Sequence, residues 1–156
     1  MSTLCKAKGN FRNARILVIE DNPDHYHLIK TAMQHCLPEV KPVPAATEAE
    51  ALAYLKHCAV ESWDLPKLIL LDLYLPGREN GWHLLDEIRS MPGAFARIPV
   101  VLLSYSDRPE DISDAYRRGC SSYLVKPGLF QDWLSYFRSL RSYWWETVTL
   151  PQVGYN

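Results

Sequence analysis

The chain lacks several features that mark common classes of protein. It has no apolar stretch long enough to cross a bilayer, and its basic, polar start at residues 1–15 is not followed by an apolar run such as a secretory signal carries. Neither sign of charge is in excess, because the formal net charge is only -1, and this balance gives non-specific nucleic-acid binding no support. We therefore expect a cytoplasmic protein that binds neither membranes nor nucleic acid.

Two motifs are also missing. The cysteines are widely spaced, with no CxxC pair and no His/Cys cluster of the kind that holds zinc, so we expect free thiols at Cys5, Cys36, Cys58 and Cys120. The first apolar run is followed by EDNPDHYH and not by a glycine-rich phosphate loop. This argues against a nucleotide-binding or flavin-binding protein.

What the chain does have is the composition of an ordinary globular protein. Its 156 residues are 47% hydrophobic and 22% charged, which suits one domain of moderate size. We expect an extension at 1–14, a folded domain at 15–145 and a short tail at 146–156. A separate output domain is not expected.

Five short apolar runs alternate with five segments of helical spacing. Strict alternation predicts an α/β fold, a doubly wound parallel sheet with helices on both faces, in the flavodoxin-like strand order 2-1-3-4-5. The second run contains Pro42 and Pro44, so it should be an edge strand. The expected strands are 16–19, a short one within 41–47, one ending at Asp72, one ending at Ser104, and 122–125.

The helices are expected between these runs. Asn22 and Pro23 should begin the first, and Thr47 with Glu50 forms a possible capping box for the second, whose apolar stripe is predicted at Ala49, Leu52, Ala53 and Leu55. The fourth should run from about 109 to 118 and the last from about 130 to 145. In the last helix the predicted core stripe is Phe130, Trp133, Leu134, Phe137, Leu140 and Trp144.

The residues that end the strands carry the chemical signal. In an open α/β sheet, ligands bind beyond the carboxyl ends of the strands, and those ends hold Glu20 and Asp21, Asp72, Ser104 and Lys126. Three carboxylates close together repel one another unless a cation shares them, and Mg²⁺ prefers oxygen ligands. With Lys126 and the metal neutralising phosphoryl oxygens, Asp72 could accept a phosphoryl group in line.

A hydroxyl beside such a site could report its state. Ser104 could turn toward a new phosphoryl oxygen and draw its loop inward. Tyr123, near the start of the last strand, is expected to fill the space that this movement frees. Ser104 and Tyr123 are therefore the predicted switch.

The motifs EDN, LLDLYLP, VVLLS and YLVKP, in this order and spacing, resemble the receiver domain of bacterial response regulators, over about Arg15 to Tyr143. The resemblance implies that Asp72 is the phosphoacceptor and that Lys126 and Ser104 contact the phosphoryl group. It implies Mg²⁺ held by Glu20, Asp21, Asp72 and the backbone carbonyl of Tyr74. It also implies a cis Lys126–Pro127 bond.

The resemblance further implies a stand-alone switch that is not an enzyme and has slow autophosphatase activity at most. The ending SYWWETVTLP is similar to the small regulators that partner phytochromes, so the expected partner is a sensor histidine kinase, preferably a phytochrome. A homodimer is expected through the helix at 109–118, the strand at 122–125 and the last helix. Arg117, Arg118, Arg138 and Arg141 offer charges for a partner on this face.

Some residues depart from the family pattern. Tyr105 is bulkier than the small residue often found after the switch serine and could restrict access, and the PGRENG turn is one residue longer than usual. A phosphoaspartate hydrolase would usually have a second acid where Tyr74 stands, and a degenerate receiver used only for protein binding remains an alternative. A metal site that includes His25 is the less favoured interpretation, and no partner can be identified for His83.

Overall fold

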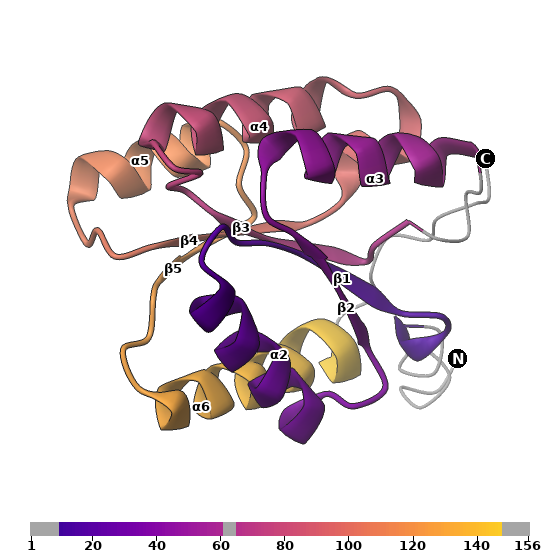
Figure 1. Cartoon of the computed structure of the whole chain (residues 1–156), viewed down its shortest axis with the longest axis vertical. Coiled ribbons are helices and arrows are strands. Elements are labelled where there is room, and N and C mark those ends of the chain that lie inside the picture. Colours follow the sequence, from indigo (N-terminus) through magenta and orange to yellow (C-terminus); the bar gives the residue numbers. More distant parts are fainter. Residues whose placement is uncertain (1–9, 61–64, 148–156) are drawn as a thin grey trace.

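The computed structural model describes residues 10–60 and 65–147, which form a five-stranded parallel sheet covered by helices on both faces (Figure 1). The strand order is β2-β1-β3-β4-β5, so the predicted fold and topology are confirmed. The strands are β1 (Arg15–Ile19), β2 (Lys41–Ala45), β3 (Leu68–Asp72), β4 (Val100–Ser104) and β5 (Ser122–Val125). The helices are α2 (Pro23–Cys36), α3 (Glu48–Val60), α4 (Arg78–Ser90), α5 (Pro109–Arg117) and α6 (Phe130–Leu140), with a 3₁₀ helix η2 (Gly93–Arg97) and a π-helix η3 (Arg141–Thr147).

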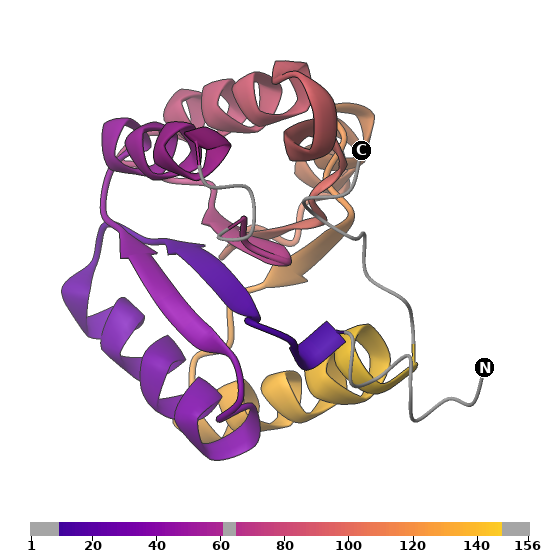
Figure 2. The ribbon, with the colours of Figure 1, turned by 90° about the vertical axis from the view of Figure 1, so that its right-hand side faces the viewer.

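The sheet separates two apolar cores. Figures 1 and 2 both place α3 and α4 on one face and α2 and α6 on the other. Side chains alternate along each strand, so Leu17 and Ile19 pack in the first core while Ile16 and Val18 pack in the second. Because helices cover both faces, every residue of β3 and β4 is buried, which explains why these strands read as continuous apolar runs.

The edge position of β2 is confirmed. This strand pairs only with β1, and Pro42 and Pro44 lie opposite Ile16 and Val18. A proline has no N–H to donate to a ladder, so an edge strand with a single partner tolerates it.

The predicted caps of two helices are present. The Asn22 side chain accepts hydrogen bonds from the N–H groups of Asp24 (2.9 Å) and His25 (3.3 Å). Thr47 Oγ accepts from the Glu50 N–H at 3.1 Å, and the Glu50 carboxylate accepts from the Ala46 N–H at 2.7 Å. Both helices therefore begin where their sequence signals place them.

The predicted apolar stripe of α3 is partly wrong. Ala49 and Ala53 are exposed, whereas the buried residues are Ala51, Leu55 and Cys58. These three follow the i, i+4, i+7 spacing of one helix face. Alanine occurs on every side of this helix, so only the packing of α3 on the sheet decides which side is buried.

The end of the chain's last helix also differs from expectation. The α-helix stops at Leu140 and continues as the π-helix η3, with its wider turn. This shift buries Trp145 completely, although the predicted stripe contained Trp144, which is only half-buried. The Asn10 side-chain amide donates to the Trp145 carbonyl at 3.0 Å and ties the start of the described chain to this helix.

Some expectations concern features at the limits of the described chain. None of Cys36, Cys58 and Cys120 forms a disulfide, as predicted, while Cys5 lies outside the described residues. The predicted extension at 1–14 and tail at 146–156 also fall largely outside them. Within the described residues, no helix has both the length and the apolar character needed to span a membrane.

Candidate functional site

The predicted acidic residues meet at one edge of the sheet. Glu20 and Asp21 directly follow β1, and Asp72 is the last residue of the neighbouring strand β3. One carboxylate oxygen from each of the three lies within 4.8 Å of the others. This oxygen-only donor set fits a hard divalent cation such as Mg²⁺.

Lys126 reaches the same point from the end of β5. Its Nζ donates to Glu20 Oε2 at 2.6 Å and lies 3.4 Å from Asp72 Oδ2. The Lys126 side chain is only 3% exposed, so the ammonium is shielded from water and acts on these two carboxylates at short range.

The crowding of acids changes the acidity of Asp72. Burial, followed by repulsion from Glu20, raises the pKa of Asp72 to about 7, and the attraction of Lys126 only partly offsets this. A carboxylate placed beside another buried carboxylate is stabilised by a further cation. The site therefore favours binding of a divalent ion.

A cavity of about 210 Å³ opens at this cluster, and His25 and Tyr105 stand at its mouth. His25 Nδ1 lies 3.2 Å from Lys126 Nζ, and the Tyr105 hydroxyl lies 3.4 Å from His25 Nε2. Lys126 Nζ also lies 5.2 Å from the centre of the Tyr105 ring. The sequence indicated the bulk of Tyr105, and a metal site that includes His25 was the less favoured interpretation. The position of His25 in the first turn of α2, soon after β1, was the available signal that it lies at this cavity.

The predicted switch residues come from two neighbouring strands, β4 and β5, and both contact the segment after β4. Ser104 is fully buried, and its Oγ accepts a hydrogen bond from the Ser106 N–H at 3.1 Å. The Tyr123 hydroxyl donates to the Ser106 carbonyl at 2.7 Å. Both side chains therefore hold the segment after β4, and Ser104 does not line the cavity at Asp72.

A buried carboxylate that the sequence analysis missed joins this segment to α4. Asp111 of α5 is 3% exposed and accepts from Arg78 at 2.6 Å and from the Ser106 hydroxyl at 2.5 Å. No strand end or motif marks Asp111 in the sequence. Its role arises only because α5 brings it between two loops.

The cis peptide bond lies in the turn after β3 and not after Lys126. Within the described residues the only cis peptide bond is Leu75–Pro76, so the expected cis bond at Lys126–Pro127 is wrong. The ammonium of Lys126 reaches Glu20 and Asp72 with a trans bond after it. Tyr74 lines the cavity, and its N–H approaches Asp72 Oδ1 at 3.4 Å.

Comparison with known proteins identifies the family. The family model described as the response regulator receiver domain matches residues 16–137. The chain belongs to this family. Response regulator Rcp1 of Synechocystis is 32% identical over 137 residues, covering 87% of this chain and 92% of Rcp1. The probable methanogenesis regulatory protein FilR2 of Methanothrix harundinacea is 33% identical over 129 residues, covering 83% of this chain and 82% of FilR2.

Solved structures give the same result. The phosphorylated cyanobacterial phytochrome response regulator RcpA matches with a TM-score of 0.77 and 34% identity, covering 89% of this chain and 99% of that one. Manganese-bound Rcp1 matches with a TM-score of 0.75 and 31% identity over the same shares. The resemblance to receivers, and to those of the phytochrome regulators, is confirmed.

Most arginines of this receiver that were expected to serve a partner are paired within the chain. Arg117 lies 3.1 Å from Asp114 Oδ1, Arg118 lies 2.9 Å from Asp86 Oδ2, and Arg141 lies 2.6 Å from Glu39 Oε2. Of the four, only Arg138 has no ion pair among the described residues. A partner would therefore compete with existing contacts on this face.

Proposed function

We propose that this receiver is a phosphorylation switch, in which Asp72 accepts a phosphoryl group from a sensor histidine kinase. The observation that carries the proposal is the position of Lys126, whose ammonium contacts the carboxylates of Glu20 and Asp72 in the lining of a cavity. Receiver domains are signalling switches and generally not enzymes. Slow autophosphatase activity is the most that we expect.

The residues present fit Mg²⁺. Glu20, Asp21, Asp72 and the backbone carbonyl of Tyr74 would hold it, since the three carboxylates form an oxygen-only set, and burial together with repulsion from Glu20 raises the pKa of Asp72. When bound, the metal would neutralise charge on the phosphoryl oxygens. The structure of Rcp1 with Mn²⁺ supports a divalent ion in a related receiver.

The chemistry of the transfer follows from the positions of two residues. A carboxylate oxygen of Asp72 attacks phosphorus, an O–P bond forms, the P–N bond of the phosphohistidine breaks, and the imidazole leaves with its electron pair and then takes up a proton. Lys126 keeps its ammonium beside Asp72 and pairs with the incoming phosphoryl oxygens. An acyl phosphate on Asp72 results.

The signal would pass through the segment after β4. If Ser104 turns its hydroxyl toward the phosphoryl group, it gives up the hydrogen bond from the Ser106 N–H. Tyr123 bonds the carbonyl of the same Ser106, so the movement changes its contact as well. Ser104 and Tyr123 would then form the two-state element that phosphorylation biases.

Partner assignments rest on similarity and on the exposed face. We propose a phytochrome as the kinase, because RcpA is described as a phytochrome response regulator, and a homodimer through α5, β5 and α6. Tyr116 and Val125 are exposed apolar side chains on this face. Binding to nucleic acid or membranes is not proposed, and the proposed location is the cytoplasm.

Intact mass spectrometry after incubation with acetyl phosphate and Mg²⁺ tests the switch. The wild type should gain one phosphoryl group, Asp72→Asn should gain none, and the exposed-acid control Asp132→Asn should match the wild type. Chelation of the metal should abolish labelling. If a known receiver is labelled and this one is not, the chain is a receiver used only for protein binding.

A phosphoaspartate hydrolase is the rival function. Steady release of many phosphates per chain from acetyl phosphate or a sugar phosphate, dependent on Asp72, would favour the hydrolase. Labelling followed by slow loss supports the switch.

A further inference from the structure

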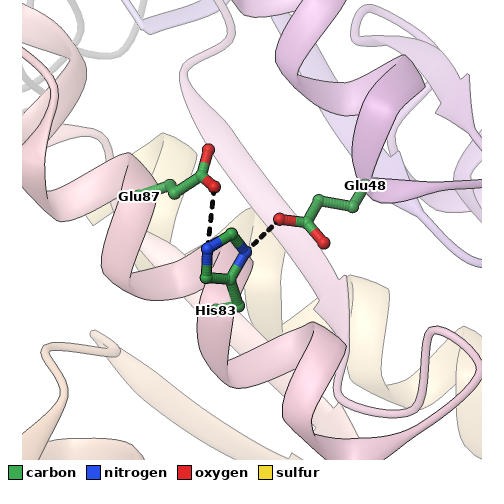
Figure 3. A group of neighbouring side chains, drawn as sticks. All are labelled: Glu48, His83 and Glu87. Carbon is green, nitrogen blue, oxygen red and sulfur yellow. Dashed lines mark hydrogen bonds and ion pairs between the residues drawn. The ribbon is translucent and has the colours of Figure 1, made fainter.

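A second ligand-bearing cluster lies away from the cavity at Asp72. Figure 3 shows the His83 ring between two carboxylates, with its two ring nitrogens pointing toward Glu48 and Glu87. His83 Nδ1 contacts the Glu48 carboxylate, and His83 Nε2 lies 3.0 Å from Glu87 Oε1. The sequence analysis identified no partner for His83: Glu48 stands 35 positions away, and the i,i+4 spacing to Glu87 was missed.

The cluster joins two neighbouring helices. His83 and Glu87 are four residues apart in α4, so they share one face of that helix. Glu48 is the first residue of α3, which lies beside α4 on the same face of the sheet in Figures 1 and 2. The three side chains therefore meet at the α3–α4 seam.

The spacing of the donor atoms suits a shared metal ion. One ligand atom from each of the three residues lies within 4.8 Å of the others. Two donors that each bind zinc at about 2.0 to 2.1 Å are roughly 2.8 to 3.4 Å apart for angles between a right angle and a tetrahedral one. The 3.0 Å separation of His83 Nε2 from Glu87 Oε1 falls in this range.

The donor types and exposure decide which ion. An imidazole nitrogen with two carboxylates suits Zn²⁺ better than Mg²⁺, which prefers oxygen ligands alone. The side chains of His83, Glu87 and Glu48 are 62%, 36% and 22% exposed, so an ion can enter and water can complete its coordination. Two carboxylates around one imidazole also require a positive charge, which either a proton or a metal ion supplies.

We propose that Glu48, His83 and Glu87 form a Zn²⁺ site that links α3 to α4. The ion binds His83 Nε2, in place of its proton, and a carboxylate oxygen of Glu87 beside it. The Glu48 side chain, which contacts Nδ1 in this structure, turns to supply the third ligand. The site shares no residue with the proposed magnesium site at Glu20, Asp21 and Asp72. It does not depend on the proposed phosphorylation.

Calorimetric titration with ZnCl₂ tests the site, in excess Mg²⁺ so that the acidic cavity is occupied. Wild type should bind one Zn²⁺ whose affinity falls at least about tenfold in His83→Ala and in Glu48→Gln. His57→Ala, which removes another exposed histidine from α3, is the matched control and should bind as the wild type does. The Zn²⁺-induced rise in melting temperature should be lost in the same two variants.

Two results would overturn the proposal. If neither the wild type nor His83→Ala binds Zn²⁺, the cluster is only a proton-bridged ion pair between two helices. If both bind Zn²⁺ with the same affinity, other ligands hold it. Circular dichroism and labelling by acetyl phosphate verify that each variant is folded, and the titration itself contains no phosphoryl donor, so failure of this site and failure of the switch are told apart.

Discussion

The chain contains two carboxylate clusters that differ in burial and in the cation that accompanies them. At the ends of β1 and β3, Glu20 and Asp72 are 1% and 7% exposed and meet the buried ammonium of Lys126. At the α3–α4 seam, Glu48 and Glu87 meet His83 in contact with water. Water screens the charges of the second cluster and not those of the first. Removing a charge should therefore change the free energy of unfolding more in the first cluster than in the second.

The largest effect is expected from removing the buried cation. Lys126→Met leaves Glu20 and Asp72 buried without their partner, and we expect a loss of about 3 to 5 kcal/mol in the free energy of unfolding. Urea unfolding at about pH 8 without divalent ions measures it, and Mg²⁺ should restore part of the loss. The exposed control Lys56→Met should change little. A loss as small as that of the control would mean that burial does not make the charges of the first cluster more important for stability than those of the second.

Removing the buried negative charge of Asp72 should stabilise the metal-free protein, the opposite of removing Lys126. Because the pKa of Asp72 is raised from 3.8 to about 7, the folded protein holds a proton that the unfolded chain releases between these values. The free energy of unfolding should therefore fall as pH rises through this window, by this group's contribution. Without metal, Asp72→Asn should be about 1 to 3 kcal/mol more stable than wild type near pH 8 and equal to it near pH 4.

Urea unfolding of wild type and Asp72→Asn across this pH range tests the sign. Mg²⁺ should stabilise the wild type more than the variant and reduce the difference between them. A variant that is less stable than wild type at the higher pH would show that Lys126 already neutralises the site.

Removing the charge of Asp111 should have an intermediate effect on stability, because this buried carboxylate pairs with the partly exposed Arg78. Asp111→Asn should lower the free energy of unfolding by about 1 to 2 kcal/mol, since Arg78 can turn to water when its partner loses its charge. Asp114→Asn breaks an exposed pair with Arg117 and should cost less than about 0.5 kcal/mol. Equal losses in urea unfolding would contradict a role for burial.

Removing His83 from the exposed cluster should change the stability least. The carboxylate of Glu48 raises the pKa of His83, so the pair stabilises the fold fully below the usual pKa of histidine and loses this effect as pH rises through the raised value. Without divalent ions, His83→Gln should lower the melting temperature slightly at low pH, and high salt should remove the difference. A difference that persists in high salt would indicate packing and not charge.

Most of the fold could be predicted from local signals. The strands β1, β3 and β4 matched their continuous apolar runs because helices cover both faces of the sheet there, and Asn22 and Thr47 marked helix starts by capping chemistry. The buried face of α3 and the π-turn that selects Trp145 were not predictable. Both depend on which surface the neighbouring elements present.

The candidate site divides in the same way. Glu20, Asp21, Asp72 and Lys126 could be predicted as neighbours because they end strands of one parallel sheet, and the carboxyl ends of such strands share an edge. Asp111 and the contact of His83 with Glu48 could not, because they depend on how separate helices are rotated and packed against one another.

The sequence by itself determined the alternation of strands and helices, the strand order and the acids at the strand ends, because each rests on periodicity and connection rules that act over a few residues or a single crossover. The tertiary structure decided which cation pairs directly with which carboxylate. Lys126 pairs with Glu20 inside the predicted group of strand-end residues, Arg78 pairs with Asp111, and His83 pairs with Glu48. These pairs join residues far apart in the chain, and their energies depend on burial, which exists only once the helices have packed on the sheet.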